Sequence, residues 1–199
     1  MNVADICRNG ELSDTLVDVC MSYFVSPRHK DRCAVMNALW LQYARQDLAS
    51  VALDERLVTA EFLYVPIWQA HHWVGAIVCR SSVGRYRVLV VDSLRGKGSP
   101  LNIKPHCALL TEILRMANAI HGSALSSVSV DAVMVEDSPV QPNLVDCALY
   151  MTMCFSKHSA ILPNIHAQDS PKWDGALSFR HPEIQQMRRD LHSFITQSG

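Results

Sequence analysis

Three short apolar runs in the middle of the chain constrain its fold more than any other feature. Residues 61–68, 73–79 and 86–91 are rich in Val, Ile and aromatic side chains, which favour β-strands. The turn-forming sequence Ser-Ser-Val-Gly at 81–84 separates the last two runs and predicts a hairpin. A sheet built from such strands needs other elements to cover its faces.

Helical periodicity lies on both sides of these runs. Ser13 can cap a first helix, and Pro27 lies just beyond its end. A later helix follows the glycine- and proline-bearing stretch 95–105 and ends near Gly122, and the last helix starts near Pro182. The apolar positions at helical spacing are Leu16, Cys20, Tyr23 and Phe24, then Met36, Leu39, Trp40 and Tyr43, then Leu110, Ile113, Leu114 and Ala117, and finally Ile184, Met187, Leu191 and Ile195.

The second half of the chain predicts one more strand and a helix that begins at a cysteine. Valines recur over 128–135 with one break of phase, which a β-bulge can absorb. A loop with two prolines follows over 136–146, and Asp146 is placed to cap an apolar helix starting at Cys147. Helices, then strands, then helices, without regular βαβ alternation, predict the α+β class.

Composition and charge exclude several kinds of protein. The chain is 49% hydrophobic and 19% charged, so disorder and fibrous repeats are excluded, and residues 1–199 are expected to form a single domain. With 18 Lys+Arg against 19 Asp+Glu and no long basic run, we expect neither a nucleic-acid nor a membrane partner. The first ten residues lack the apolar core of a signal peptide, which predicts a cytoplasmic or nuclear protein.

The cysteines predict reduced thiols. They are odd in number, stand at positions 7, 20, 33, 79, 107, 147 and 154, and include no CxxC pair, so neither a disulfide framework nor a zinc ribbon fits. Cys147 differs from the others because a helix N-terminus stabilises an anion, and the thiolate is the nucleophilic form of cysteine. The alternative for Cys147 is a buried, inert side chain.

A histidine and an aspartate lie where a thiol nucleophile needs them. His71 and His72 begin one predicted strand, and Asp92 follows the run at 86–91. A carboxylate on one imidazole nitrogen fixes the tautomer and leaves the other nitrogen to exchange a proton with a thiol. Because neighbouring strand residues point to opposite faces, only one histidine can do this. The alternative is a surface histidine pair and an ordinary aspartate turn.

Gln141 lies six residues before Cys147, in the loop that leads to its helix. Its side-chain amide can donate to a developing oxyanion, beside the backbone N–H of Cys147. The alternative is a solvated glutamine in a loop.

These motifs, in this order, resemble those of the ubiquitin-like-protein-specific cysteine proteases, the sentrin or SUMO protease family. The similarity spans about residues 10–195. The family's HW, DSL and QPN..DC motifs correspond to His72-Trp73, Asp92-Ser93-Leu94, and Gln141-Pro142-Asn143 with Asp146-Cys147, while Leu12-Ser13-Asp14 resembles its WLND segment and Val65-Pro66-Ile67 the strand before its histidine.

The resemblance implies a papain-like cysteine protease, with a central mixed sheet packed by helices, that cleaves after the Gly-Gly terminus of a ubiquitin-like modifier, SUMO before others. It implies no cofactor or metal, and we expect a monomer. In its terms Cys147 is the nucleophile, His72 the general base and acid, Asp92 the orienting carboxylate and Gln141 the oxyanion donor. By the same resemblance Trp73 covers the channel for the tail, and Asp14 pairs with a basic residue of the modifier. The alternatives are a core aromatic at Trp73 and an ordinary first-turn helix aspartate at Asp14.

Two positions depart from the family pattern. Glu11 stands where the family usually has the tryptophan that forms the other lid of the tail channel, and Ala148 replaces the glycine after the nucleophile. A carboxylate cannot reproduce an apolar clamp, and these departures favour the first of two alternatives that stay open. One is a catalytically weak protein that binds a modifier, and the other is an acyltransferase with a similar His, acidic and Cys site.

Overall fold

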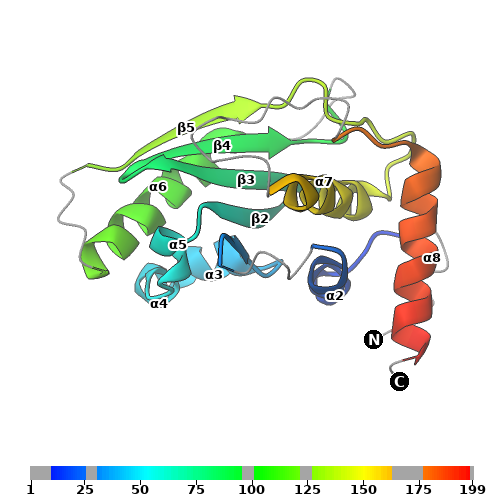
Figure 1. Cartoon of the computed structure of the whole chain (residues 1–199), viewed down its shortest axis with the longest axis horizontal. Helices are drawn as coiled ribbons and strands as arrows, with labels where there is room; N and C mark the ends of the chain where they lie inside the picture. The colour runs from blue at the N-terminus through cyan, green and yellow to red at the C-terminus, as the bar shows by residue number, and fades with distance from the viewer. Residues whose placement is uncertain (1–9, 26–30, 96–100, 122–126, 163–176, 198–199) are drawn as a thin grey trace.

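The computed structural model describes residues 10–25, 31–95, 101–121, 127–162 and 177–197 (Figure 1). Its centre is a five-stranded mixed sheet of order β1-β2-β3-β4-β5. The strands are β1 (Cys33–Val35), β2 (Phe62–Gln69), β3 (His72–Ser82), β4 (Arg85–Val91) and β5 (Ser129–Met134). The three central strands are antiparallel, whereas β1 and β5 run parallel to their neighbours. The predicted α+β class and the three central strands are therefore confirmed.

Helices bury both faces of this sheet. The helices are α2 (Asp14–Phe24), α3 (Trp40–Gln46), α4 (Leu48–Ala52), α5 (Arg56–Thr59), α6 (Ile103–Ile120), α7 (Cys147–Ile161) and α8 (His181–Gln197). One core joins α2, α7 and α8 to one face, and a second core joins α3, α4, α5 and α6 to the other. Because both faces are covered, the middle of each central strand is a continuous buried apolar run rather than an alternating one, at 62–67 in β2, 73–79 in β3 and 88–91 in β4.

The helix that carries Cys147 packs closely on β3. A methyl group at Gly75 would lie 2.6 Å from Cγ2 of Val91 and 2.8 Å from Cε1 of Phe155, a residue of α7. No side chain larger than hydrogen fits there without displacement. Gly75 therefore lets α7 approach the sheet, which brings the start of the helix near the start of β3.

Most predicted elements are present, but some limits differ. Ser13 caps α2 as predicted, with its Oγ accepting from the Leu16 N–H at 3.4 Å. The second helix begins only at Trp40, because Met36 extends from β1 and donates its N–H to the Tyr64 carbonyl at 2.9 Å. Pro105 lies inside α6 rather than before it, in a first turn where a missing N–H costs nothing. Pro27, Gly122 and Cys7 lie outside the described residues.

The predicted bulge in the last strand is wrong. The register of β5 against β4 runs without a shift from Ser129 to Met134, and the irregularity lies instead in β3, between Arg80 and Ser82. Since β5 is an edge strand with mostly exposed side chains, its apolar residues need not keep one phase. No described helix is long and apolar enough to cross a membrane.

Candidate active site

A tight turn places His72 at the start of β3. Strands β2 and β3 form a hairpin in which Gln69 faces His72, so that Ala70 and His71 alone make the turn, with φ of 49° and 62°. Positive φ at both central residues is the type I′ pattern, usually built from Asn and Gly. The expectation that strand alternation separates the two histidines is therefore wrong, because His71 lies in the turn. His71 is exposed and His72 is buried.

His72 and Asp92 form a buried pair. Nε2 of His72 lies 2.8 Å from Oδ1 of Asp92, and each residue is 2% exposed. Burial lowers the pKa of His72, but the hydrogen bond and charge of Asp92, together with the interaction with Cys147, outweigh it and raise the pKa to about 9. Nδ1 of His72 is buried and forms no hydrogen bond of ordinary geometry with the described residues. This nitrogen is the one left for proton exchange.

Cys147 is the first residue of α7 and is 1% exposed. Its contribution to the pKa of His72 shows that the structure brings the predicted nucleophile and base together. The other described cysteines are also free thiols. Burial raises the pKa of Cys20 and of Cys79 to about 12, and it raises the pKa of Cys154 as well. These buried thiols have the character of the inert core cysteines that the sequence predicts.

Gln141 is fully buried, not solvated. Its Oε1 accepts from the Ser93 hydroxyl at 2.5 Å, and its backbone N–H donates to the Ser93 carbonyl at 2.9 Å. Its Nε2 donates to the Asn143 carbonyl at 2.6 Å. Two of the predicted motifs are thus bonded to each other through Gln141 and Ser93. Sequence reasoning missed this role of Ser93, which only its place directly after Asp92 could have suggested.

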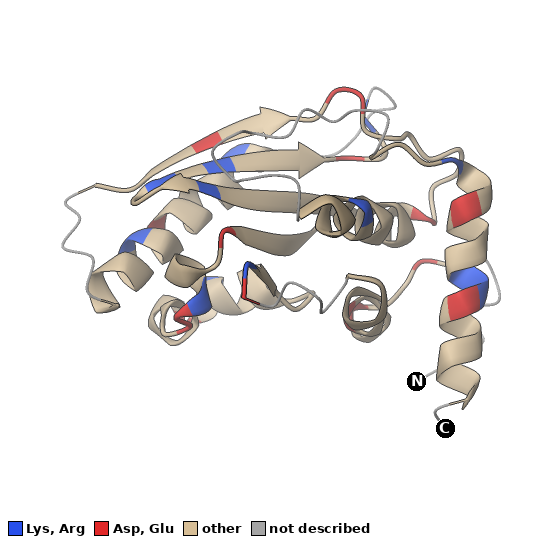
Figure 2. Ribbon diagram, in the orientation of Figure 1, with Lys and Arg blue, Asp and Glu red and all other residues tan. Residues whose placement is uncertain are grey.

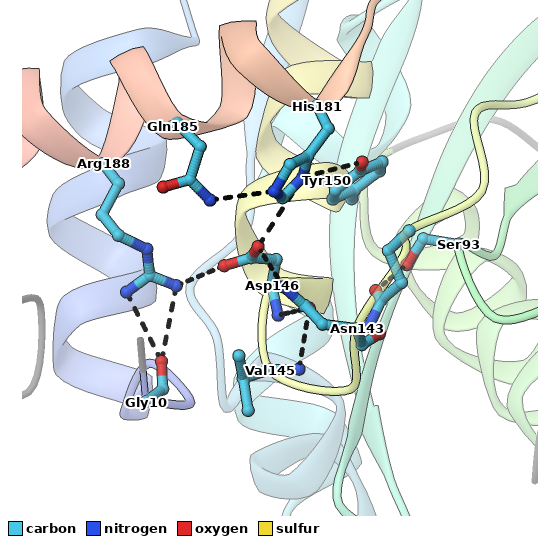
Figure 3. Close-up of polar contacts among 10 residues, drawn as sticks. Gly10, Ser93, Asn143, Val145, Asp146, Tyr150, His181, Gln185 and Arg188 are labelled. Atoms are coloured by element: carbon cyan, nitrogen blue, oxygen red, sulfur yellow. Dashed lines mark hydrogen bonds and ion pairs between the residues drawn. The ribbon is translucent and has the colours of Figure 1, made fainter. Parts of the chain in front are cut away.

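Asp146 has the predicted position before α7 but not the predicted contact. Its side chain makes no capping bond to the helix. Instead Oδ1 accepts from Nη2 of Arg188 at 2.5 Å, and Oδ2 accepts from Nδ2 of Asn143 at 2.7 Å (Figure 3). Arg188 is buried with the carboxylate, and Asn143 is half-buried beside it. Arg188 was missed, although a lone charge on the apolar face of its helix is a readable signal.

The three predicted binding residues Glu11, Asp14 and Trp73 line one groove of about 520 Å³. Nε1 of Trp73 donates to the Leu12 carbonyl at 3.3 Å, which ties the groove wall to the start of β3. Trp68, which sequence reasoning missed, lines the same groove, with its ring 4.9 Å from that of Trp73. The remaining lining residues are Leu12, Ser13, Leu39 and Gln42.

Acidic and basic residues are interspersed over the described helices and strands (Figure 2). Within the described ranges, no group of three or more His, Cys, Asp or Glu side chains is arranged to hold a metal ion. The site itself contains a thiol, an imidazole–carboxylate pair and a side-chain amide.

Comparison with a protein-family model gives one match. Residues 12–193 match the Ulp1 protease family, C-terminal catalytic domain. No curated protein matches the sequence.

Solved structures share the fold. The crystal structure of a de-sumoylating protease superposes with a TM-score of 0.73 at 15% identity, covering 97% of this chain and 83% of that one. The C-terminal protease domain of Ulp1 in complex with Smt3, the yeast ortholog of SUMO, gives 0.64 at 18% identity, with 96% and 79% covered. The Xanthomonas campestris effector XopD bound to ubiquitin gives 0.55 at 10% identity, with 91% of each chain covered. At such identities these matches show the fold alone.

Proposed function

We propose, from the premise that this chain belongs to the Ulp1 protease family, that it hydrolyses the isopeptide or peptide bond after the C-terminal tail of a ubiquitin-like modifier, SUMO before others. The observation that carries the proposal is the buried pair of His72 and Asp92 beside Cys147. Asp92 holds Nε2, so Nδ1 faces the chemistry at the thiol. A protein that only binds a modifier has no need of this arrangement.

The proposed reaction has two halves. The Cys147 thiolate attacks the carbonyl carbon of the last tail residue, and the carbonyl oxygen takes a negative charge that the Gln141 amide and the Cys147 backbone N–H stabilise. His72, protonated at neutral pH because its pKa is about 9, gives its proton to the leaving amine, and a thioester remains. Neutral His72 then takes a proton from water, which attacks the thioester and releases the modifier and the thiol.

The shape of the groove favours a narrow peptide tail as the part of the substrate that enters the site. Trp73 adjoins His72 in the sequence and closes one side, and Trp68 adds a second aromatic wall. Glu11 is exposed at the rim, and Asp14 gives the groove a further acidic group. Aromatic walls hold an extended glycine tail by excluding water and restricting its motion. Asp14 suits a basic residue on the body of the modifier.

The proposal extends to the setting of the enzyme. Residues 1–199 act as one catalytic domain, monomeric, without a cofactor or a nucleic-acid or membrane partner, in the cytoplasm or nucleus. SUMO is placed first because two of the compared structures are described by their action on or complex with SUMO, whereas one is bound to ubiquitin.

The second candidate is a modifier-binding protein with weak activity, which Glu11 and Ala148 favour. Glu11 leaves the groove without an aromatic lid at that position, and the buried Ala148 adds a methyl group next to the nucleophile. An acyltransferase is less well supported, because the bond between Ser93 and Gln141 builds an amide donor into the site.

A panel of modifiers with a thiol-reactive group at the C-terminus separates these candidates. We expect the SUMO probe to form a covalent adduct with the wild type and none with Cys147→Ala. If only the ubiquitin probe forms an adduct, the protein is still a cysteine protease of this class, but its modifier is ubiquitin rather than SUMO. Binding of unmodified SUMO without any adduct would favour the binding protein. If no modifier binds and none forms an adduct, the proposal is overturned.

A further inference from the structure

A buried ion pair joins the last helix to the residue before the nucleophile. Arg188 of α8 is 5% exposed and Asp146 is 1% exposed, and Nη2 of the guanidinium lies 2.5 Å from Oδ1 of the carboxylate (Figure 3). A buried pair of this kind is weak support for stability, because replacing both charges by apolar residues is often neutral or stabilising. The pair therefore matters for the geometry of the neighbouring loop more than for stability.

The contacts of Asp146 continue to the predicted oxyanion donor. Nδ2 of Asn143 donates to Oδ2 of Asp146 at 2.7 Å, while Oδ1 of Asn143 accepts from the N–H groups of Val145 and Asp146, each at 3.1 Å. The Gln141 amide donates to the Asn143 carbonyl at 2.6 Å. One chain of hydrogen bonds thus runs from Arg188 to Gln141, and Cys147 directly follows Asp146.

The guanidinium itself is held from a second side. Nη1 and Nη2 of Arg188 both lie 3.5 Å from the Gly10 carbonyl, directly before Glu11 of the groove. Near the same carboxylate, Nδ1 of His181 lies 3.9 Å from Oδ2 of Asp146 and 3.3 Å from the Tyr150 hydroxyl. A planar guanidinium can serve two acceptors in fixed directions, which a lysine ammonium cannot reproduce.

We propose that Arg188 is a positioning residue of the active site: through Asp146 it holds the 141–147 loop so that Gln141 and Cys147 keep their relative placement. This inference rests on the proposed function for its kinetic consequence, but not for its structural one. Arg188→Lys keeps the positive charge but removes the planar guanidinium that serves two acceptors. Since a displacement of about 1 Å can cost on the order of 10²-fold in rate, we expect kcat to fall about 10–100-fold with little change in KM.

Amide hydrogen exchange tests the positioning directly. In Arg188→Lys we expect the N–H groups of Gln141, Val145 and Asp146 to exchange at least about tenfold faster, because their loop opens locally, while those of β2 and β3 keep their protection. Arg189→Lys is the matched control, since Arg189 is the next residue of the same helix, exposed and bonded only to Gln186 among the described contacts. Unchanged loop exchange in Arg188→Lys would overturn the proposal, as would equal changes in the control.

A kinetic comparison separates positioning from loss of folded protein. Iodoacetamide alkylates Cys147 without needing an oxyanion donor, so its rate in Arg188→Lys should stay near that of the wild type while kcat falls. A fall of both rates by the same factor would indicate unfolding and contradict the proposal. If the wild type hydrolyses no modifier at all, the proposed function fails, and the exchange experiment still decides the role of Arg188.

The double variant Asp146→Leu/Arg188→Met tests the proposal even if the single variant Arg188→Lys does not fold. It removes both charges together, so the fold is expected to survive. If Arg188 only stabilises the fold, this variant should recover wild-type kcat. We expect it to keep a kcat reduced about 10–100-fold and fast exchange at Val145, because Asn143 has lost its acceptor. Wild-type kcat in the double variant would overturn the proposal.

Discussion

Nε2 of His72 lies 2.8 Å from Oδ1 of Asp92, and the same carboxylate oxygen accepts from the Leu94 backbone N–H at 2.8 Å. The carboxylate is therefore oriented by its own loop before it orients the imidazole. The pair forms because β3 and β4 are antiparallel, with Gly75 opposite Val91. The start of β3 and the end of β4 therefore lie at the same end of the hairpin.

Replacing Asp92 by asparagine should slow the chemistry without weakening modifier binding. The neutral amide of the new side chain no longer favours the imidazolium and can impose the wrong tautomer on His72. We expect kcat to fall on the order of 10²–10⁴-fold, measured by hydrolysis of a SUMO precursor, while the affinity for the modifier, measured in a Cys147→Ala background, stays within about threefold. Full activity of Asp92→Asn would remove Asp92 from the site.

The two adjacent histidines should differ sharply. His72→Ala removes the group that exchanges protons, so turnover should fall by roughly 10²–10⁴-fold or more, a typical contribution of general acid–base catalysis. His71→Ala changes only an exposed residue of the turn and should have much less effect. Turnover numbers for both variants decide between them, and the opposite ranking would assign the role to His71.

Only Cys147 should react with a modifier probe. Cys147→Ala and Cys147→Ser should abolish hydrolysis and keep the fold, because a small residue at the helix start replaces only the reacting atom. Peptide mapping after labelling should find the adduct on Cys147, since burial raises the pKa of Cys79 and of Cys154 and keeps them as thiols. Labelling that persists in Cys147→Ala and maps to either of these would refute the assignment.

Glu11 should limit the rate on SUMO conjugates. The groove has aromatic side chains at Trp73 and Trp68 but a carboxylate at Glu11, so the tail is held less rigidly. Glu11→Trp should raise kcat/KM, by up to about tenfold, and Trp73→Ala should nearly eliminate it. Hydrolysis assays across several modifiers give the comparison. A lower rate for Glu11→Trp on the best substrate would mean that Glu11 is adapted to another tail.

Two buried histidines should give opposite pH dependences of stability. The pKa of His72 is raised from about 6.5 to about 9, so its stabilisation is complete below pH 6.5 and is lost as the pH rises through 9. Burial lowers the pKa of His158 to about 4, so its contribution is present above pH 6.5 and is lost as the pH falls through 4. Each effect is on the order of 3 kcal/mol.

Urea unfolding between pH 4 and pH 9 measures both contributions. Nδ1 of His158 lies 2.9 Å from the Tyr64 hydroxyl, and the glutamine of His158→Gln can keep this hydrogen bond. Because glutamine does not titrate, the variant should reduce the pH dependence of the unfolding free energy on the acid side alone. His72→Gln should reduce the pH dependence of the unfolding free energy on the alkaline side alone. An unchanged acid slope in His158→Gln would show that other groups dominate acid unfolding.

The sequence by itself determined the elements whose signals are local. The Ser13 cap, the apolar runs of the central strands and the start of α7 at Cys147 each follow from neighbouring residues, and the structure has them at or within a few residues of the predicted positions. The order of the motifs likewise placed His72 and Asp92 in one site. Such features need only backbone propensity, periodicity and spacing.

Tertiary structure alone decided how those residues are held. The turn at Ala70 and His71 contains neither Asn nor Gly, so it forms because the pairing of β2 with β3 over eight residue pairs outweighs local preference. The bond from Ser93 to Gln141 spans 48 positions, and that from Arg188 to Asp146 spans 42. Contacts between segments so far apart leave no period in the sequence, because the packing of whole elements sets them.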